Sequence, residues 1–199
     1  ELLSDEAMCD DYVVALVTGS AVNQDGRSAS FMAPNGPSQE AVIRSALQDA
    51  ARQASDIGFV ETHGTGTALG DPMELGAIAS VMAREAAAAV VLGATKSSVG
   101  HSEGAAGIIG VIKAAMSLSQ RQVPPNLHLQ ELNPELQLAM LQPIMPQVMT
   151  DSLHDVAGGG VSSFGYTGTN AHATLASAEQ RAPKDMPKIA FLFSGQGSQ

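Results

Sequence analysis

Short apolar runs with β-strand character alternate along this chain with segments of helical periodicity, and this alternation restricts the fold more than any other feature. The predicted strands cover residues 12–18, 57–62 and 90–94, and the predicted helices cover residues 38–54, 71–88 and 105–119. Strands that alternate with helices form βαβ units, in which the helices pack on a largely parallel sheet. The sequence therefore predicts an α/β fold.

Capping signals predict where two of these helices begin. Ser38 is expected to cap the first helix, and Asp71 the second, with Pro72 in the first helical position. Glu74 then lies in the first turn, where the helix dipole favours a carboxylate. Residues 19–37 are rich in Gly, Ser, Asn and Pro, and we expect a long surface loop there.

The rest of the chain is expected to be less regular. Prolines interrupt residues 126–150, which are predicted to connect other elements and to contain one short helix near residues 134–140. Residues 161–164 and 171–176 are predicted to be adjacent strands joined by a glycine-rich turn. A polar linker is expected over residues 178–187.

Composition excludes several classes of function. Ten basic against twenty acidic residues give a formal charge of −10, so the basic surface that attracts nucleic acid is not expected. Cys9 is the only cysteine, which fits a reducing compartment, and we predict a cytoplasmic protein without an internal disulfide. No apolar run reaches the roughly 18 residues of a membrane span. We expect the chain to be a piece of a longer protein, extended at both ends.

His63 directly follows a predicted strand and lies among Gly64, Thr65, Gly66 and Thr67. Small residues there allow backbone amides and hydroxyls to converge on a substrate that larger side chains would block. A lone histidine in such a turn is more often bonded locally, but a second histidine turn farther along favours chemistry. His63 is therefore a candidate donor to a carbonyl oxygen.

His101 is the second candidate, at the start of the helix predicted over residues 105–119. Free backbone N–H groups at a helix start favour a neutral imidazole and a developing negative charge. Lys96 lies five residues earlier and would add positive potential that opposes protonation of the imidazole. Taken alone, Lys96 would be interpreted as an ordinary surface lysine.

The third histidine turn carries Phe164 between small residues, which suits a loop that lines or gates a pocket. Asn170 is expected to tie this turn together. For His172 a structural role, as a buried histidine on the following strand, is slightly preferred over a catalytic role. His128 and His154 are expected at the surface.

The sequence offers neither a metal site nor an obvious nucleophile. The histidines form no i, i+4 pair and no His-Glu-x-x-His motif. Carboxylates surround Cys9 and would suppress its thiolate. Ser194 and Ser198 lack the Gly-x-Ser-x-Gly context of a nucleophile turn. The sequence thus offers candidate hydrogen-bond donors to an oxyanion, but it offers no evident nucleophile that would attack a carbonyl.

The three histidine turns together resemble the C-terminal half of a β-ketoacyl synthase of the type I polyketide synthase kind. The resemblance extends from about residue 12 to residue 177, with the motifs in the family's order, and is carried by residues 19–26, 33–39, 61–67, 96–101 and 162–172. It implies a thiolase-like αβαβα sandwich, of which this chain is the C-terminal half. Residues 1–130 would belong to the ketosynthase, residues 131–187 to its extension, final strands and linker, and residues 188–199 to the first strand of a truncated acyltransferase domain.

The resemblance also implies a reaction and a set of residue roles. Members condense an acyl thioester with a malonyl-type extender by decarboxylative Claisen condensation. His63 and His101 would promote decarboxylation and bind the enolate oxygen, and Lys96 would support His101. The residues that would contact substrate are Thr65, Thr67, Phe164, Gly165, Gly168 and Asn170.

The same resemblance implies partners and leaves two alternatives open. Phosphopantetheine would arrive on an acyl carrier protein rather than as a resident cofactor, and the ketosynthase would form a homodimer beside an acyltransferase domain. The family's nucleophilic cysteine would precede residue 1, so the chain alone is expected to be inactive. The alternatives are a non-condensing scaffold that docks a carrier domain and a chain-initiating malonyl decarboxylase.

Overall fold

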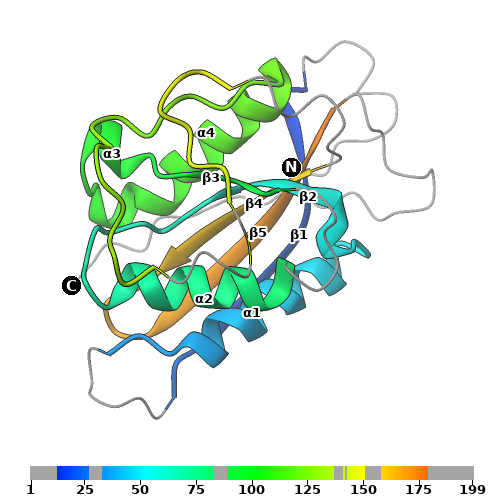
Figure 1. Cartoon of the computed structure of the whole chain (residues 1–199). Coiled ribbons are helices and arrows are strands. Elements are labelled where there is room, and N and C mark those ends of the chain that lie inside the picture. The colour runs from blue at the N-terminus through cyan, green and yellow to red at the C-terminus, as the bar shows by residue number, and fades with distance from the viewer. Residues whose placement is uncertain are drawn as a thin grey trace.

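The computed structural model describes residues 13–26, 33–82, 89–136, 141, 143–150 and 158–178. Within these ranges the chain forms one five-stranded mixed sheet with helices on both faces (Figure 1). The strands are β1 (Ala15–Gln24), β2 (Ile57–Glu61), β3 (Val91–Gly93), β4 (Gly158–Phe164) and β5 (Thr169–Ser177). The helices are α1 (Gly36–Asp49), η2 (Ala54–Asp56), α2 (Gly70–Met82), α3 (Lys96–Val99), η3 (Glu103–Ala105) and α4 (Ala106–Gln120). The predicted α/β class is confirmed.

The sheet order is β1-β5-β4-β2-β3. β4, β2 and β3 are mutually parallel, whereas β5 runs antiparallel to both of its neighbours, β1 and β4. The C-terminal ends of β1, β2, β3 and β4 and the N-terminal end of β5 therefore lie at the same edge of the sheet. Segments that follow the parallel strands meet at that edge, which is where open α/β sheets place their ligands.

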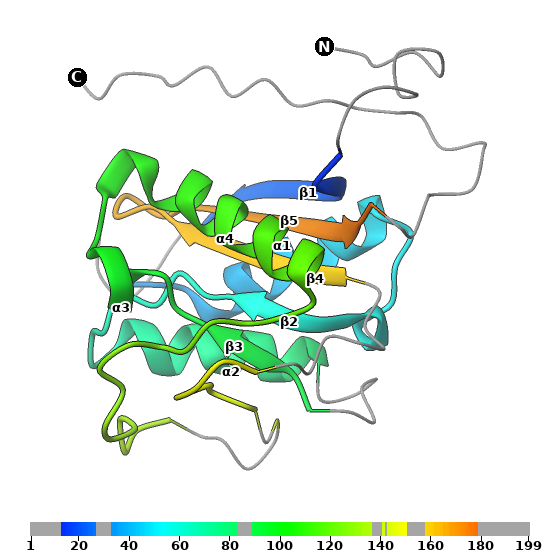
Figure 2. The same ribbon diagram turned by 90° about the horizontal axis from the view of Figure 1, so that it is seen from above.

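Two apolar cores fill the space between the sheet and its helices. α1 and α2 cover one face, and α4 covers the other (Figures 1 and 2). The first core includes Val42, Ile43, Val60, Ile78 and Leu92. The second includes Phe59, Val91, Ala114, Leu118 and Leu175. Most of these side chains are aliphatic.

The prediction of a long loop over residues 19–37 is wrong for its first part, because β1 continues to Gln24. Nine residues of β1 pair with β5, and this pairing outweighs the local preference for a loop. Gly19 is also not a turn glycine: a Cβ there would lie 2.6 Å from the carbonyl oxygen of Ala46 in α1. The glycine allows the helix to approach the strand.

Helix boundaries differ from the predictions for local reasons. Asn35, not Ser38, caps α1, since its side chain accepts a hydrogen bond from the Ser38 N–H at 3.2 Å. α1 ends at Asp49 instead of residue 54, and α2 begins one residue before Asp71. The Asp71 carboxylate does not cap α2, because it accepts from the Gly66 N–H at 3.1 Å.

The segment from residue 96 to 104, predicted as a turn, contains the short helices α3 and η3. Ile144, in the segment predicted to be irregular, forms a parallel bridge with Val91 at the edge of the sheet. The short helix predicted near residues 134–140 lies mostly outside the described residues, as do Cys9, His154 and residues 179–199. No described helix has the length and apolar character that crossing a bilayer requires.

Candidate active site

The strand directions bring the sequence-predicted residues together at one edge of the sheet. His63 follows β2, Lys96 follows β3, and Phe164 ends β4. The imidazole centroids of His63 and His101 are 5.6 Å apart, with an interplanar angle of 84°. The Phe164 ring lies 5.7 Å from His63, tilted by 56°. Two histidines and an aromatic ring from segments far apart in the sequence thus form one cluster.

The environment of His63 keeps its imidazole neutral. Burial lowers the pKa of His63 to about 4, and the charge of Lys96 and the neighbouring His101 add to the effect. Its Nδ1 atom is buried and has no hydrogen-bond partner among the described residues, which leaves Nε2 as the nitrogen available to a substrate. At neutral pH this ring can donate or accept a hydrogen bond, but it carries no charge.

The backbone after His101 fixes the tautomer of that imidazole. The Glu103 N–H donates a hydrogen bond to Nδ1 of His101 at 3.0 Å, so in the neutral ring the proton lies on Nε2. Glu103 adopts a left-handed backbone with φ of 48°, which is uncommon for a residue other than glycine. The turn therefore presents the Nε2–H of His101 as a donor.

A carboxylate that the sequence analysis treated only as a first-turn charge orients the His63 turn. Glu74 is 4% exposed and accepts from the N–H groups of His63 at 2.7 Å and Gly64 at 2.9 Å. Burial raises the pKa of Glu74 to about 7, although the two backbone donors act in the opposite direction. Asp71 lies one helical turn earlier, and burial raises its pKa as well. The sequence signal for this role was the three-residue spacing of Asp71 and Glu74, because that spacing places both carboxylates on the same side of α2, facing the turn.

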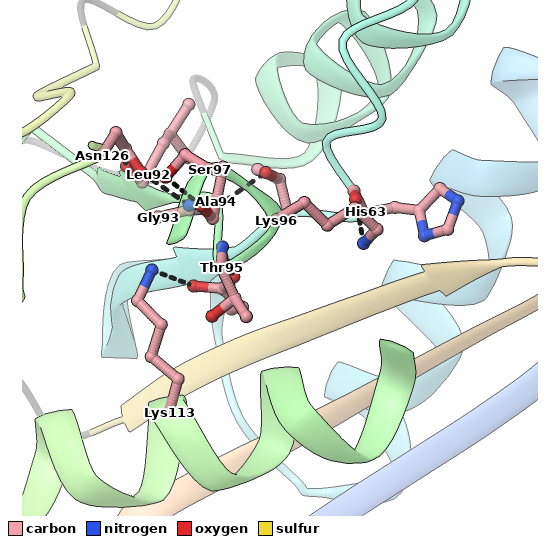
Figure 3. A network of polar contacts seen from close by, with 11 residues as sticks. His63, Leu92, Gly93, Ala94, Thr95, Lys96, Ser97, Lys113 and Asn126 are labelled. Atoms are coloured by element: carbon pink, nitrogen blue, oxygen red, sulfur yellow. Dashed lines mark hydrogen bonds and ion pairs between the residues drawn. The ribbon is translucent and has the colours of Figure 1, made fainter. Parts of the chain in front are cut away.

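Lys96 contacts the first histidine turn. Its Nζ donates a hydrogen bond to the backbone carbonyl of His63, and Figure 3 shows the two residues side by side. Burial lowers the pKa of Lys96, while the charges of Glu74, Glu61 and Asp71 counteract that shift. The role implied for Lys96, support of His101, stays a prediction, but its hydrogen bond and its charge act on His63.

The proposed substrate-contacting residues lie around this cluster. The hydroxyl oxygens of Thr65 and Thr67 are 3.2 Å apart on the exposed part of the His63 turn. In the glycine-rich loop, Gly165 N–H donates to the Thr169 carbonyl at 2.6 Å, and Gly168 adopts φ of 89°. A side chain at Gly168 would be strained and would meet Asp25.

Asn170 ties the glycine-rich loop to the end of β1, as expected of a turn-stabilising residue. Its Nδ2 donates to Asp25 Oδ1 at 2.7 Å and to Asn23 Oδ1 at 3.1 Å. The Asp25 N–H donates to the Gly168 carbonyl at 2.8 Å, and the Asn35 side chain donates to the Asp25 carbonyl at 2.8 Å. Asp25 was not singled out from the sequence, because its partners are more than 140 residues away or on the next helix.

His172 is structural, in agreement with the preferred prediction. It lies on β5, is 2% exposed, and its Nδ1 is 3.0 Å from the Ser162 hydroxyl on β4. A Cβ at Gly160 would come within 2.8 Å of its Nε2, so the glycine makes room for the ring. Burial lowers the pKa of His172 to about 4. It is a neutral core histidine.

A cavity of about 470 Å³ lies behind the His63 turn. Its polar lining includes Gly64, Asp71, Glu74 and Lys96, while the segment from Leu127 to Leu136 supplies much of the apolar lining. The lining includes neither His63 nor His101, so the cavity borders Lys96 and the two carboxylates but not the imidazoles. Among the described residues, no three His, Cys, Asp or Glu side chains are arranged to bind a metal ion.

Comparison with known proteins gives consistent results. The family described as "Beta-ketoacyl synthase, C-terminal domain" matches residues 14–130. Spectinabilin polyketide synthase system protein NorA' of Streptomyces orinoci is 44% identical over 194 residues, which are 94% of this chain and 5% of that protein. Erythronolide synthase EryA2 of Saccharopolyspora erythraea is 41% identical over 189 residues, 92% of this chain and 5% of that protein.

Solved structures resemble the chain in fold as well. The oxazolomycin ketosynthase domain OzmH KS7 from Streptomyces albus JA3453 aligns with a TM-score of 0.82 and 31% identity, over 91% of this chain and 33% of that one. The ketosynthase from module 6 of the bacillaene synthase of Bacillus subtilis 168 aligns with a TM-score of 0.79 and 31% identity, over 86% of this chain and 32% of that one. The chain therefore spans a third of these ketosynthase chains and only 5% of the two curated relatives, and the predicted thiolase-like fold class is confirmed.

Proposed function

This chain belongs to the β-ketoacyl synthase family as its C-terminal domain, and from that premise we propose that it supplies the decarboxylating and enolate-binding part of a polyketide synthase ketosynthase. The family is one of transferases. The observation that carries the proposal is the pair of imidazoles 5.6 Å apart beside Phe164, with one ring held neutral and the other presenting Nε2–H.

The proposed reaction begins with a malonyl thioester. The bond between its carboxylate carbon and the α-carbon breaks, carbon dioxide leaves, and the electron pair forms an enolate whose oxygen becomes negative. His63 and His101 donate hydrogen bonds to that oxygen, and each such donor is worth on the order of 10²–10³ in rate. The enolate carbon then attacks an acyl thioester, a new carbon–carbon bond forms, and the enzyme's thiolate leaves.

A neutral His63 suits this step better than a charged one. An imidazolium would transfer its proton to the enolate oxygen and quench the carbon nucleophile, whereas a neutral ring stabilises the charge without that transfer. The pKa of about 4 ensures the neutral form at working pH. Glu74 and Lys96 act on the backbone of the same turn, so they position the ring.

Substrate and partners follow from the same proposal. Thr65, Thr67 and the loop around Phe164, Gly165, Gly168 and Asn170 would contact a thioester carried on the phosphopantetheine of an acyl carrier protein. The nucleophilic cysteine would lie outside this chain, so we expect the isolated chain to be inactive as a 3-oxoacyl synthase. A cytoplasmic homodimer with an adjacent acyltransferase domain, and the domain boundaries at residues 130 and 187, remain predictions.

The test is His63→Ala in the intact ketosynthase with its carrier domain. We expect carbon dioxide release from malonyl-loaded carrier to fall by about 10²–10³, with acyl loading of the nucleophile within a few-fold of the parent. The matched control is His128→Ala, because His128 is exposed on the rim of the cavity. Normal carbon dioxide release from the His63 variant would refute its assigned role.

A further inference from the structure

We propose that the buried ion pair between Glu61 and Lys113 is a positioning device that connects all three segments bearing His63, Lys96 and His101. This inference rests on the proposed function. Glu61 is the last residue of β2, two positions before His63, and is 1% exposed. Its Oε2 lies 2.8 Å from Nζ of Lys113 on α4, whose side chain is 14% exposed.

The second oxygen of Glu61 reaches the Lys96 segment. The Thr95 N–H, directly before Lys96, donates to Oε1 of Glu61 at 2.5 Å. Figure 3 shows Lys113 extending from α4 toward Thr95, with Lys96 and His63, which belong to two different turns, beyond it. The Glu61 carboxylate therefore contacts two segments. It accepts a hydrogen bond from the residue before Lys96, and it forms an ion pair with the helix that begins five positions after His101.

Neighbouring glycines leave the space that this pair occupies. A Cβ at Gly93 of β3 would lie 2.5 Å from Oε2 of Glu61 and 2.9 Å from Nζ of Lys113. A Cβ at Gly110 of α4 would lie 3.4 Å from Cγ of Glu61. The pair thus lies on the face of the sheet covered by α4, at a point where β3 has no side chain, which indicates that packing in this region is built around it.

Stability alone does not account for the pair. The cost of removing two charges from water offsets most of their attraction, and apolar residues of similar volume often serve a core equally well. A charged pair with an additional backbone bond does, however, restrict the relative position of the segments that it joins. Two further contacts join the same turns: Thr62 N–H donates to the Gly93 carbonyl at 2.8 Å, and Lys96 donates to the His63 carbonyl.

The effect on chemistry follows from the separation of the donors. The enolate oxygen must lie within hydrogen-bond distance of both His63 and His101, and these residues belong to different segments. A displacement of about 1 Å in such a site costs on the order of 100-fold in rate. Glu61 and Lys113 act through the histidines, so they are positioning residues and not catalytic ones.

The experiment uses the intact ketosynthase with its carrier and three variants. Glu61→Gln removes the negative charge but keeps an acceptor for Thr95, Lys113→Met removes the cation and leaves a buried carboxylate, and the double variant leaves no net buried charge. Glu40→Gln is the matched control, because it breaks the half-exposed ion pair with Arg44 on α1. For each variant, carbon dioxide release, acyl loading and the unfolding temperature are measured.

We expect Lys113→Met to lower both the unfolding temperature and carbon dioxide release. In the double variant we expect the unfolding temperature to return toward that of the parent while carbon dioxide release stays at least tenfold lower, with acyl loading within about threefold. Recovery of release together with stability in the double variant would show a purely structural role and overturn the proposal. A parent enzyme that releases no carbon dioxide would refute the proposed function instead.

Discussion

The contact between Glu74 and the His63 turn gives the most specific prediction. Glu74→Gln keeps the shape of the side chain but leaves only one acceptor for two backbone N–H groups, now 2.7 and 2.9 Å from the carboxylate oxygens. The amide nitrogen then faces an N–H, so one donor loses its partner. A hydrogen bond to a charged group is worth about 1.5–3 kcal/mol. Gln also avoids the burial of a charge, which raises the pKa of Glu74, so we expect a net loss of stability smaller than that at pH 8.

The same substitution should alter the pH dependence of activity. Because the pKa of Glu74 is raised to about 7, its carboxylate accepts hydrogen bonds from both N–H groups above pH 7. Below pH 7 it becomes protonated and loses one acceptor. Carbon dioxide release by the parent should therefore rise through pH 7. In the Gln variant that rise should be absent, and release at pH 8 should be lower by on the order of tenfold to 100-fold.

Stability should follow the opposite trend, which separates the two effects. A carboxyl whose folded pKa lies above its unfolded value of 4.5 contributes stability that is fully present below pH 4.5 and is lost as the pH rises through 7. The shift corresponds to at most about 3 kcal/mol. The assays are carbon dioxide release and denaturant unfolding from pH 5 to 8.5, with Glu131→Gln, at the exposed rim of the cavity, as the control. A Gln variant with the parent's pH profile would refute the reasoning.

Two further predictions use other parts of the structure. The pKa of His172 is lowered to about 4 by burial, so its contribution to stability is present above pH 6.5 and lost as the pH falls through 4. We expect His172→Gln to remove up to about 3 kcal/mol of this acid sensitivity. A variant whose unfolding free energy changes between pH 7 and 4.5 by the same amount as that of the parent would contradict this. α4 exposes Ile108, Ile112 and Met116 at four-residue spacing, so the isolated chain should bind the dye ANS and associate. Ile112→Glu with Met116→Glu should reduce both, whereas a monomeric parent chain without dye binding would disprove the argument.

The sequence was sufficient to predict the fold class and to select His63 and His101 as candidate site residues. Strands β2 and β3 and helix α4 begin and end within two residues of the predicted positions, because their apolar periodicity is strong and their ends carry clear turn signals. The order of the motifs predicted that His63, His101 and Phe164 belong to one site. In the structure the ring centroid of His63 lies 5.6 Å from that of His101 and 5.7 Å from that of Phe164.

What the sequence could not supply depends on contacts between distant residues. The second half of β1 has the composition of a loop, and only its pairing with β5, some 150 residues later, makes it a strand. The partners of Asp25 and Glu61 likewise lie on other elements, so the sequence alone presents their carboxylates as ordinary turn and strand residues.

The contrast between Glu61 and Glu74 shows how buried charge serves this site. Both carboxylates are almost fully buried, and both bond backbone N–H groups of the turns that bear His63 and Lys96. Glu61 has Lys113 as a direct cationic partner, whereas Glu74 has none in direct contact among the described residues, and burial raises the pKa of Glu74. The site therefore holds one carboxylate that is paired with a lysine and one whose charge varies near neutral pH. Burial and the charge of Lys96, not these carboxylates, keep His63 neutral, and a neutral ring can donate to the enolate oxygen without protonating it.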